Sequence, residues 1–131
     1  MPATPAQATA AECTNGANGF TGIPYDKNGS TVHSVDIGSG VTVKLQQGYI
    51  NGSNHGWARI DGSTWAGDRV WMDWTWDNGA HWIQCGPFTV QSNGSPSTSA
   101  AKVTSPSTSY RFRACGRLLG ESSVSCCTPW W

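Results

Sequence analysis

Apolar and polar residues alternate along several short stretches of the chain, with the two-residue period of β-strands. Val41, Val43 and Leu45 are separated by polar residues, so the strand predicted at residues 41–46 has one apolar face. We expect that face to pack on a core and the opposite face to meet solvent. The same pattern predicts further strands at residues 31–37, 56–60 and 110–114.

The strongest strand signal spans residues 69–90 and has a turn sequence in its middle. Asn78-Gly79 favours a two-residue hairpin turn, because both residues tolerate a positive φ. Closing the hairpin there puts Thr75 opposite Trp82, and the remaining pairs follow from this register. The two strands then agree on which face is apolar and which is polar, and this agreement supports the register.

The alternation divides the tryptophans of this hairpin between two faces. It predicts that Trp74 and Trp76 lie on the inner face with Val70 and Met72. Tryptophan exposed on the outer face of a rigid sheet serves either as a platform for sugar stacking or as an anchor at a protein interface. Alternatively, residues 91–108 or the C-terminal tail cover these rings. The predicted outer face carries Trp57, Trp71, Asp73, Trp82 and Gln84.

Signals for other secondary structure are weak. No stretch keeps apolar residues at helical spacing for three turns, and 16 Gly with 7 Pro interrupt any long helix. Residues 91–108 are rich in Ser, Thr, Pro and Gly and are predicted to form a long, mobile surface loop. Short strands separated by turns predict an all-β fold, either a small antiparallel β-sandwich or a barrel stapled by disulfides.

Composition indicates a secreted protein. The charged residues cancel, with Lys+Arg 8 and Asp+Glu 8, so there is no basic surface for nucleic acid. The sequence contains no apolar run long enough for a membrane span, and 8 Trp argue against disorder. Near the N-terminus, Ala6-Gln7-Ala8 and Ala8-Thr9-Ala10 match the small-residue pattern of signal-peptide cleavage sites.

The domain boundaries follow from this pattern. Residues 1–12 are interpreted as the remnant of a signal peptide, or alternatively as a flexible Ala/Pro tail. Residues 13–131 are expected to form a single β domain that begins with an extended segment, residues 13–30.

Five cysteines suit a disulfide-bonded extracellular domain. None forms a Cys-x-x-Cys pair beside a histidine cluster, so we expect no metal site. Two bridges would leave one thiol over, and several pairings satisfy the count. The pairing that we favour joins Cys85 to Cys115, and Cys13 to Cys126 or Cys127.

No catalytic set is evident. The three histidines, His33, His55 and His81, accompany no nucleophile motif such as Gly-x-Ser-x-Gly. A glycosidase needs two carboxylates across a cleft, and Asp73 on the outer face has no evident second member. We therefore expect neither an enzyme nor a cofactor.

The N-terminal segment is a second candidate for binding. Residues 19–25 form a short extended piece that could add to the edge of a partner's sheet or lie in its groove. The alternative is that they form an edge strand of the chain's own sheet. The residues expected to contact a partner are Phe20, Ile23, Pro24 and Tyr25.

Three blocks carry a family resemblance: residues 67–75 (GDRVWMDWT), 82–88 (WIQCGPF) and 110–116 (YRFRACG). Across residues 56–118 the chain resembles small secreted proteins of actinomycetes, and among them it is similar to the adapter subunit of umbrella toxin particles. The resemblance implies a connector between a lectin-like protein of degenerate protease fold and a repeat-bearing toxin. It also implies that residues 19–25 lodge in the cleft of the lectin-like partner. The Cys126-Cys127 tail with Trp130-Trp131 departs from this pattern.

Three functions follow as hypotheses. The first is a secreted, non-catalytic adapter that binds proteins of an extracellular toxin complex, and the N-terminal segment and neutral surface favour it. The second is a carbohydrate-binding module that uses Trp71 and Trp82. The third is a protease inhibitor or small toxin, which disulfides suit but no reactive-loop signature supports.

Overall fold

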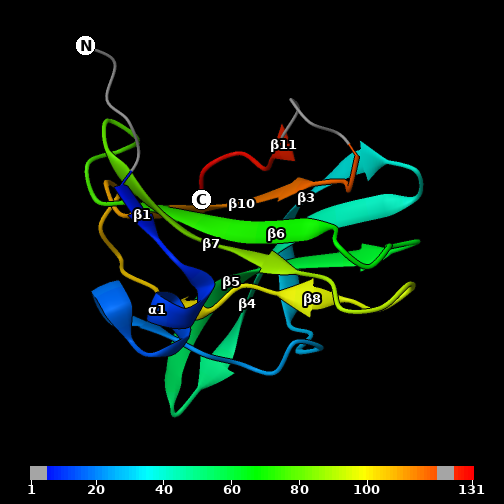
Figure 1. Ribbon diagram of the computed structural model, residues 1–131. Helices are drawn as coiled ribbons and strands as arrows, with labels where there is room; N and C mark the ends of the chain where they lie inside the picture. The colour runs from blue at the N-terminus through cyan, green and yellow to red at the C-terminus, as the bar shows by residue number, and fades with distance from the viewer. Residues whose placement is uncertain (1–5, 121–125) are drawn as a thin grey trace.

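A computed structural model describes residues 6–120 and 126–131 and shows two β-sheets packed face to face (Figure 1). The sheets are not closed into a barrel, so the sandwich is confirmed among the two predicted architectures. The first sheet has the order β1 (Ala6–Ala8), β7 (Trp82–Thr89), β6 (Arg69–Thr75), β10 (Arg111–Arg117) and β11 (Cys126–Cys127).

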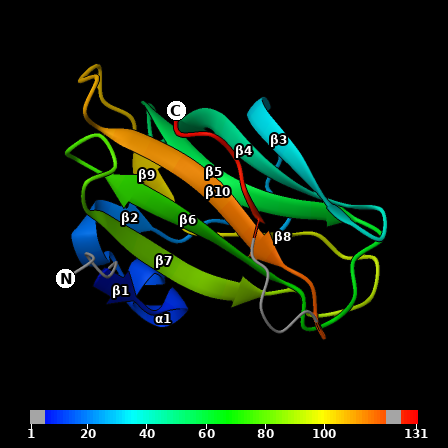
Figure 2. The ribbon, with the colours of Figure 1, turned by 90° about the horizontal axis from the view of Figure 1, so that it is seen from above.

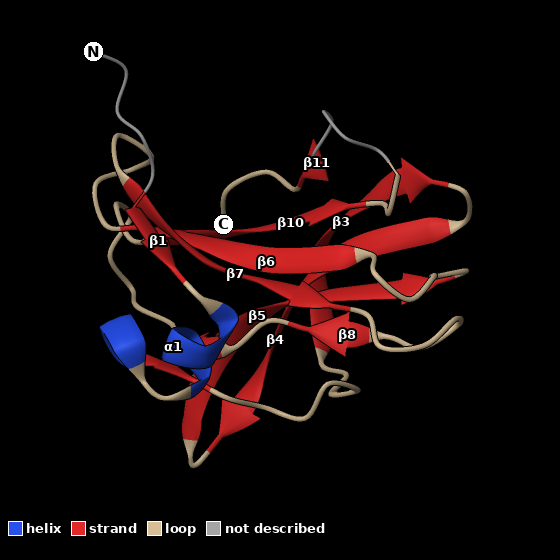
Figure 3. Cartoon of the chain, viewed as in Figure 1, coloured by secondary structure: helices blue, strands red, loops and turns tan. Residues whose placement is uncertain are grey.

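The second sheet contains the remaining strands. Its order is β2 (Phe20–Thr21), β9 (Ala101–Val103), β5 (Ser53–Gly62), β4 (Val41–Ile50) and β3 (Ser30–Gly38), and β8 (Ser97–Thr98) also pairs with β5. Within residues 6–120 and 126–131, helical structure is limited to α1 (Ala10–Thr14) and a 3₁₀ turn at Ala17–Gly19 (Figure 3). Among the described residues, neither helix has the length or apolar character to cross a membrane.

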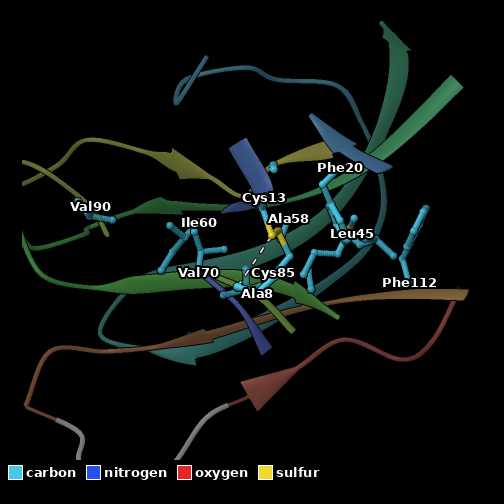
Figure 4. Close-up of a cluster of buried hydrophobic side chains, with 14 of the residues drawn as sticks. Ala8, Cys13, Phe20, Leu45, Ala58, Ile60, Val70, Cys85, Val90 and Phe112 are labelled. Atoms are coloured by element: carbon cyan, nitrogen blue, oxygen red, sulfur yellow. Dashed lines mark hydrogen bonds between the residues drawn. A yellow bond between two sulfur atoms is a disulfide. The ribbon is translucent and has the colours of Figure 1, made fainter. Parts of the chain in front are cut away.

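The core lies between the sheets, as the alternation predicted. Apolar side chains from both inner faces interdigitate there and exclude water. Figure 4 shows part of this cluster, with the disulfide at its centre. Its fully buried members include Val41, Val43, Leu45, Ile60, Val70 and Met72.

The hairpin of β6 and β7 has the predicted register but not the predicted turn. Thr75 pairs with Trp82, as expected, but the ladder ends there and residues 76–81 form a longer connection. Because β6 ends at Thr75, the alternation does not extend to Trp76, whose residue surface is 43% exposed. The prediction that Trp76 lies inside is therefore wrong. Trp74 packs against the core, as predicted.

The N-terminal residues are more ordered than a tail. The first five lie outside the described residues, but β1 adds in parallel to the edge of β7, and α1 follows directly. A capping box starts the helix, in which Thr9 and Glu12 bond each other's backbone N–H groups. This local pairing is a helix-start signal that composition alone does not reveal.

Two disulfides are present, and their pairing differs from the one favoured above. Cys13 bonds Cys85, and Cys115 bonds Cys127, while Cys126 carries the free thiol. Cys85 faces the core beside Met72, whereas Cys115 pairs with Trp71 and faces outward. Cys85 and Cys115 therefore lie on opposite faces of one sheet and cannot meet. Instead α1 brings Cys13 to β7.

Residues 91–108 do not form one mobile loop. They contain β8 and β9, and the side chains from Ser97 to Lys102 are buried. The Ser and Thr residues of this segment can be buried against β5 because their polar atoms form hydrogen bonds with the backbone. The Ser99 hydroxyl accepts the N–H of Ala58, and the N–H of Ser99 donates to the Ala58 carbonyl, both at 2.9 Å.

Candidate functional site

The outer face of the first sheet brings together four of the five predicted surface residues. In the ladder, Asp73 is flanked by Gln84 on β7 and by Arg113 on β10. Side chains two residues apart on a strand point to the same face. Trp71 therefore lies on the outward side with Asp73, and Trp82 lies there with Gln84. Figure 2 shows β7, β6 and β10 side by side, with the C-terminal segment running along β10.

Asp73 is an ionisable side chain at the centre of this face. Its side chain is only 3% exposed, and its Oδ2 accepts a hydrogen bond from Arg113 Nε at 2.7 Å. The other oxygen, Oδ1, is buried and accepts no hydrogen bond from the described residues. Burial raises the pKa of this carboxyl above its ordinary value, and Arg113 offsets only part of the rise.

Arg113 packs against two tryptophan rings that also contact each other. Its Cζ atom lies 4.9 Å from the ring centroid of Trp82 and 4.3 Å from that of Trp130. The two rings stand edge to face at 6.3 Å. We call Trp82, Arg113 and Trp130 the tryptophan–arginine stack. Cation–π attraction and the Asp73 ion pair together fix the guanidinium in one orientation.

The C-terminal segment completes this stack. Phe112 and Trp131 exchange two backbone hydrogen bonds of 2.8 Å, so residues 128–131 extend the sheet beside β10. Trp131 packs inward against the core, which turns its neighbour Trp130 outward over Arg113. Trp130 and Arg113 were not among the residues predicted for this face. The alternation in residues 110–114 indicates that Arg113 faces outward. It does not predict that β10 pairs with β6, which is what brings Arg113 to this face.

The other predicted tryptophans are covered. Trp71 is 7% exposed, and a Cβ at Gly86 would come within 2.9 Å of its Cβ, which shows how closely β7 packs on it. Trp57 faces out of the second sheet but is fully buried. The loop at residues 27–29 lies over it, with Lys27 Nζ 5.6 Å from its ring centroid.

The N-terminal residues predicted to bind a partner have different surroundings. Phe20 is 2% exposed and belongs to the core. It lies on β2, which pairs with β9 of the same chain, so its side chain is not available to a partner. Ile23 is half-buried, and Pro24 is exposed. Tyr25 is 59% exposed. The part of the segment that remains available is thus residues 23–25.

One group of potential metal ligands lies at the same face. A carboxylate oxygen of Asp73 and the sulfur atoms of Cys115 and Cys127 lie within 4.8 Å of one another. The two sulfurs are bonded to each other, and the Asp73 carboxylate forms an ion pair with Arg113. In this oxidised form the three residues form a structural cluster that joins β6, β10 and β11.

Comparison of the chain with protein-family models, with curated proteins and with solved structures finds no match. Function is therefore inferred from the residues and their geometry. A buried carboxylate neutralised by arginine, beside two tryptophan rings, offers a preorganised contact surface. Catalysis by Asp73 would require a second acid or base, and its contacts within the described residues are with Arg113 and Cys115.

Proposed function

We propose that the chain is a secreted, non-catalytic adapter that binds proteins, and that one partner docks on the tryptophan–arginine stack. The observation that carries this proposal is the packing of Arg113 against Trp82 and Trp130, together with its ion pair to the buried Asp73. Trp and Arg are the residues most enriched at the energetic centres of protein interfaces. A side chain that is already immobilised loses little entropy when a partner binds.

The geometry favours a protein partner over a glycan on this face. A sugar stacks on an open ring face, but Arg113 already covers a face of Trp82 and of Trp130. Trp71, the other ring expected to stack, is buried. The stack does present ring edges and a guanidinium that suit a protein surface of mixed polarity.

An adapter needs a second contact surface, and residues 23–25 supply a candidate. This segment crosses the second sheet, on the side of the sandwich opposite the stack. It is anchored by Thr98 Oγ1, which donates to the Pro24 carbonyl at 3.1 Å. Arg59 Nη1 donates to the Asp26 carbonyl at 2.9 Å. Tyr25 projects from a fixed backbone and is largely exposed.

The resemblance of residues 56–118 to the adapter subunit of umbrella toxin particles suggests what is joined. The partners would be a lectin-like protein of degenerate protease fold and a repeat-bearing toxin. Secretion is consistent with the two disulfides, which persist in oxidising compartments.

The test is affinity capture from the culture medium of the native host, with the wild-type chain and three variants as baits. The wild-type chain should recover two secreted proteins in stoichiometric amounts. Trp82→Ala should lose one of them and Tyr25→Ala the other, because the two surfaces are separate. A hot-spot truncation costs about 2 kcal/mol or more, which lowers the affinity about thirtyfold.

Trp65→Ala is the matched control, since Trp65 is 63% exposed and lies outside both surfaces. It should recover both proteins. A wild-type bait that returns alone contradicts the adapter, and loss of both proteins from every variant would indicate damage to the fold rather than to a surface. Thermal unfolding of each bait distinguishes that case.

A further inference from the structure

A pocket of about 260 Å³ lies at the end of the sandwich between the loop that precedes β10 and the C-terminal segment. It is separate from both surfaces of the proposed adapter. Three aromatic side chains line it, Tyr110, Phe112 and Trp131, together with hydroxyl residues of the loop and Arg111. Pockets for drug-sized ligands span about 300–1,000 Å³, so this one suits a single small unit.

The aromatic part of the pocket is preformed. Tyr110 and Phe112 meet edge to face at 5.4 Å, and Phe112 and Trp131 lie 6.4 Å apart. Backbone hydrogen bonds between Phe112 and Trp131 fix their strands. Phe112 is only 1% exposed and belongs to the core, so the aromatic surface open to a ligand is that of Tyr110 and Trp131. Aromatic carbon surface matches the apolar C–H face of a sugar ring.

The polar part of the pocket is also held in place. Ser105 Oγ accepts the N–H of Ser107 at 3.2 Å, and Ser107 Oγ lies 2.9 Å from Ser109 Oγ. Hydroxyls donate and accept hydrogen bonds, as the hydroxyls of a sugar do. The loop therefore presents side chains that are complementary to a polyhydroxylated ligand.

Arg111 adds a charge requirement. Its Nε donates to the Thr108 carbonyl at 2.9 Å, which fixes the guanidinium at the pocket. Among the residues that the structure describes, no carboxylate forms an ion pair with Arg111, and its two Nη groups have no acceptor. A partnerless guanidinium fork is suited to bidentate binding of a carboxylate.

We propose that this pocket binds a carboxylated sugar unit, with the ring against Tyr110 and Trp131 and the carboxylate on Arg111. The hydroxyl-lined wall favours a sugar over a peptide C-terminus, because one sugar ring carries several hydroxyls that both donate and accept, whereas the last residue of a peptide adds only one N–H donor to its carboxylate. The site is independent of the adapter surfaces, so either proposal can fail without the other.

The test uses two matched pairs of sugars that differ only in the carboxylate: glucuronate with glucose, and galacturonate with galactose. Each is titrated into isotope-labelled protein and followed by amide NMR shifts. At least one uronate should perturb residues 104–112 and 131, and bind about tenfold more tightly than its neutral partner. Arg111→Gln should abolish that preference.

Arg69→Gln is the matched control, because Arg69 is exposed and pairs with Arg117 at the far end of β10. It should keep the preference. The proposal is overturned if neither uronate shifts the pocket residues, if the shifts fall elsewhere, or if Arg111→Gln keeps the tenfold difference. N-acetylglycine that binds as tightly as the uronates would show carboxylate capture without sugar recognition, and would overturn it too.

Discussion

The carboxylate of Asp73 relies on one guanidinium for its charge partner. Arg113 Nε satisfies Oδ2, while Oδ1 is buried without a partner in the described residues. Burying an ion is costly, and an arginine lost from such a pair leaves an uncompensated charge. The two tryptophans of the stack shield this pair from water and thereby raise the cost of breaking it.

We predict that Arg113→Gln lowers the free energy of unfolding by about 3 kcal/mol at neutral pH. The loss should shrink as the pH falls, because protonation of Asp73 removes the unpaired charge. The sign follows from the raised pKa of Asp73: the native state holds its proton more tightly than the unfolded chain, so its ionised form opposes folding. Urea unfolding at several pH values between neutral and acid measures this.

Arg69→Gln provides the comparison for that series, since Arg69 is exposed and forms no ion pair within the described residues. Its effect should be small and independent of pH. A loss in Arg113→Gln that is constant across the pH range would mean that packing on the tryptophans, and not the charge of Asp73, accounts for the destabilisation.

Strand alternation and the hairpin register predicted that Trp71, Asp73, Trp82 and Gln84 share one face, but they did not predict which of these residues are exposed. The register of β6 and β7 put Asp73 beside Gln84, and the structure has this pair. The burial of Trp57 depends on residues 27–29, which lie far from it in sequence. No local pattern encodes such a cover.

At the scale of elements, two identical turn sequences behave differently. Asn51-Gly52 joins β4 to β5 directly, and both residues have positive φ, as a two-residue turn requires. Asn78-Gly79 also has positive φ at both residues but lies within a six-residue connection. There the buried Thr75 hydroxyl donates to the His81 carbonyl and accepts the N–H of Gly79. Side-chain bonds thus replace ladder bonds.

The two disulfides should contribute unequally to stability. Cys13–Cys85 closes a sequence separation of 72 residues, and Cys115–Cys127 closes one of 12. The chain-entropy model then gives about 4 kcal/mol for the first bridge and about 3 kcal/mol for the second. We predict that Cys13→Ala with Cys85→Ala lowers the free energy of unfolding more than Cys115→Ala with Cys127→Ala, as measured in denaturant.

Cys126→Ala serves as the control for these variants, because Cys126 is outside both bridges and should leave the unfolding free energy almost unchanged. The opposite order, with the shorter loop costing more, would show that the Asp73 cluster on the outer face outweighs loop entropy. The pairing itself could not be predicted from spacing, because it depends on which sheet face each cysteine occupies.

At the scale of the whole molecule, the sandwich separates the two proposed docking surfaces by its own thickness. The stack lies outside the first sheet, and residues 23–25 cross the outside of the second. Lys+Arg 8 balance Asp+Glu 8, and the arginine of the stack is neutralised by Asp73. A molecule of this kind has no strong field with which to attract a charged partner from a distance.

Association at the stack should therefore depend little on salt. Exposed charges are largely screened beyond about 8 Å at physiological ionic strength, so partners steered by charge bind much more weakly as salt is added. For the protein captured through Trp82, we predict that Kd changes by less than about twofold between about 0.05 and about 0.5 M NaCl. Calorimetric titration at both salt concentrations measures this Kd. The Trp65→Ala control should show the same dependence of Kd on salt as the wild-type chain. A steep loss of affinity with added salt would mean that the partner forms ion pairs with charged residues outside the stack. The ion pair of Arg113 would not explain it, because the two tryptophan rings already shield that pair from solvent.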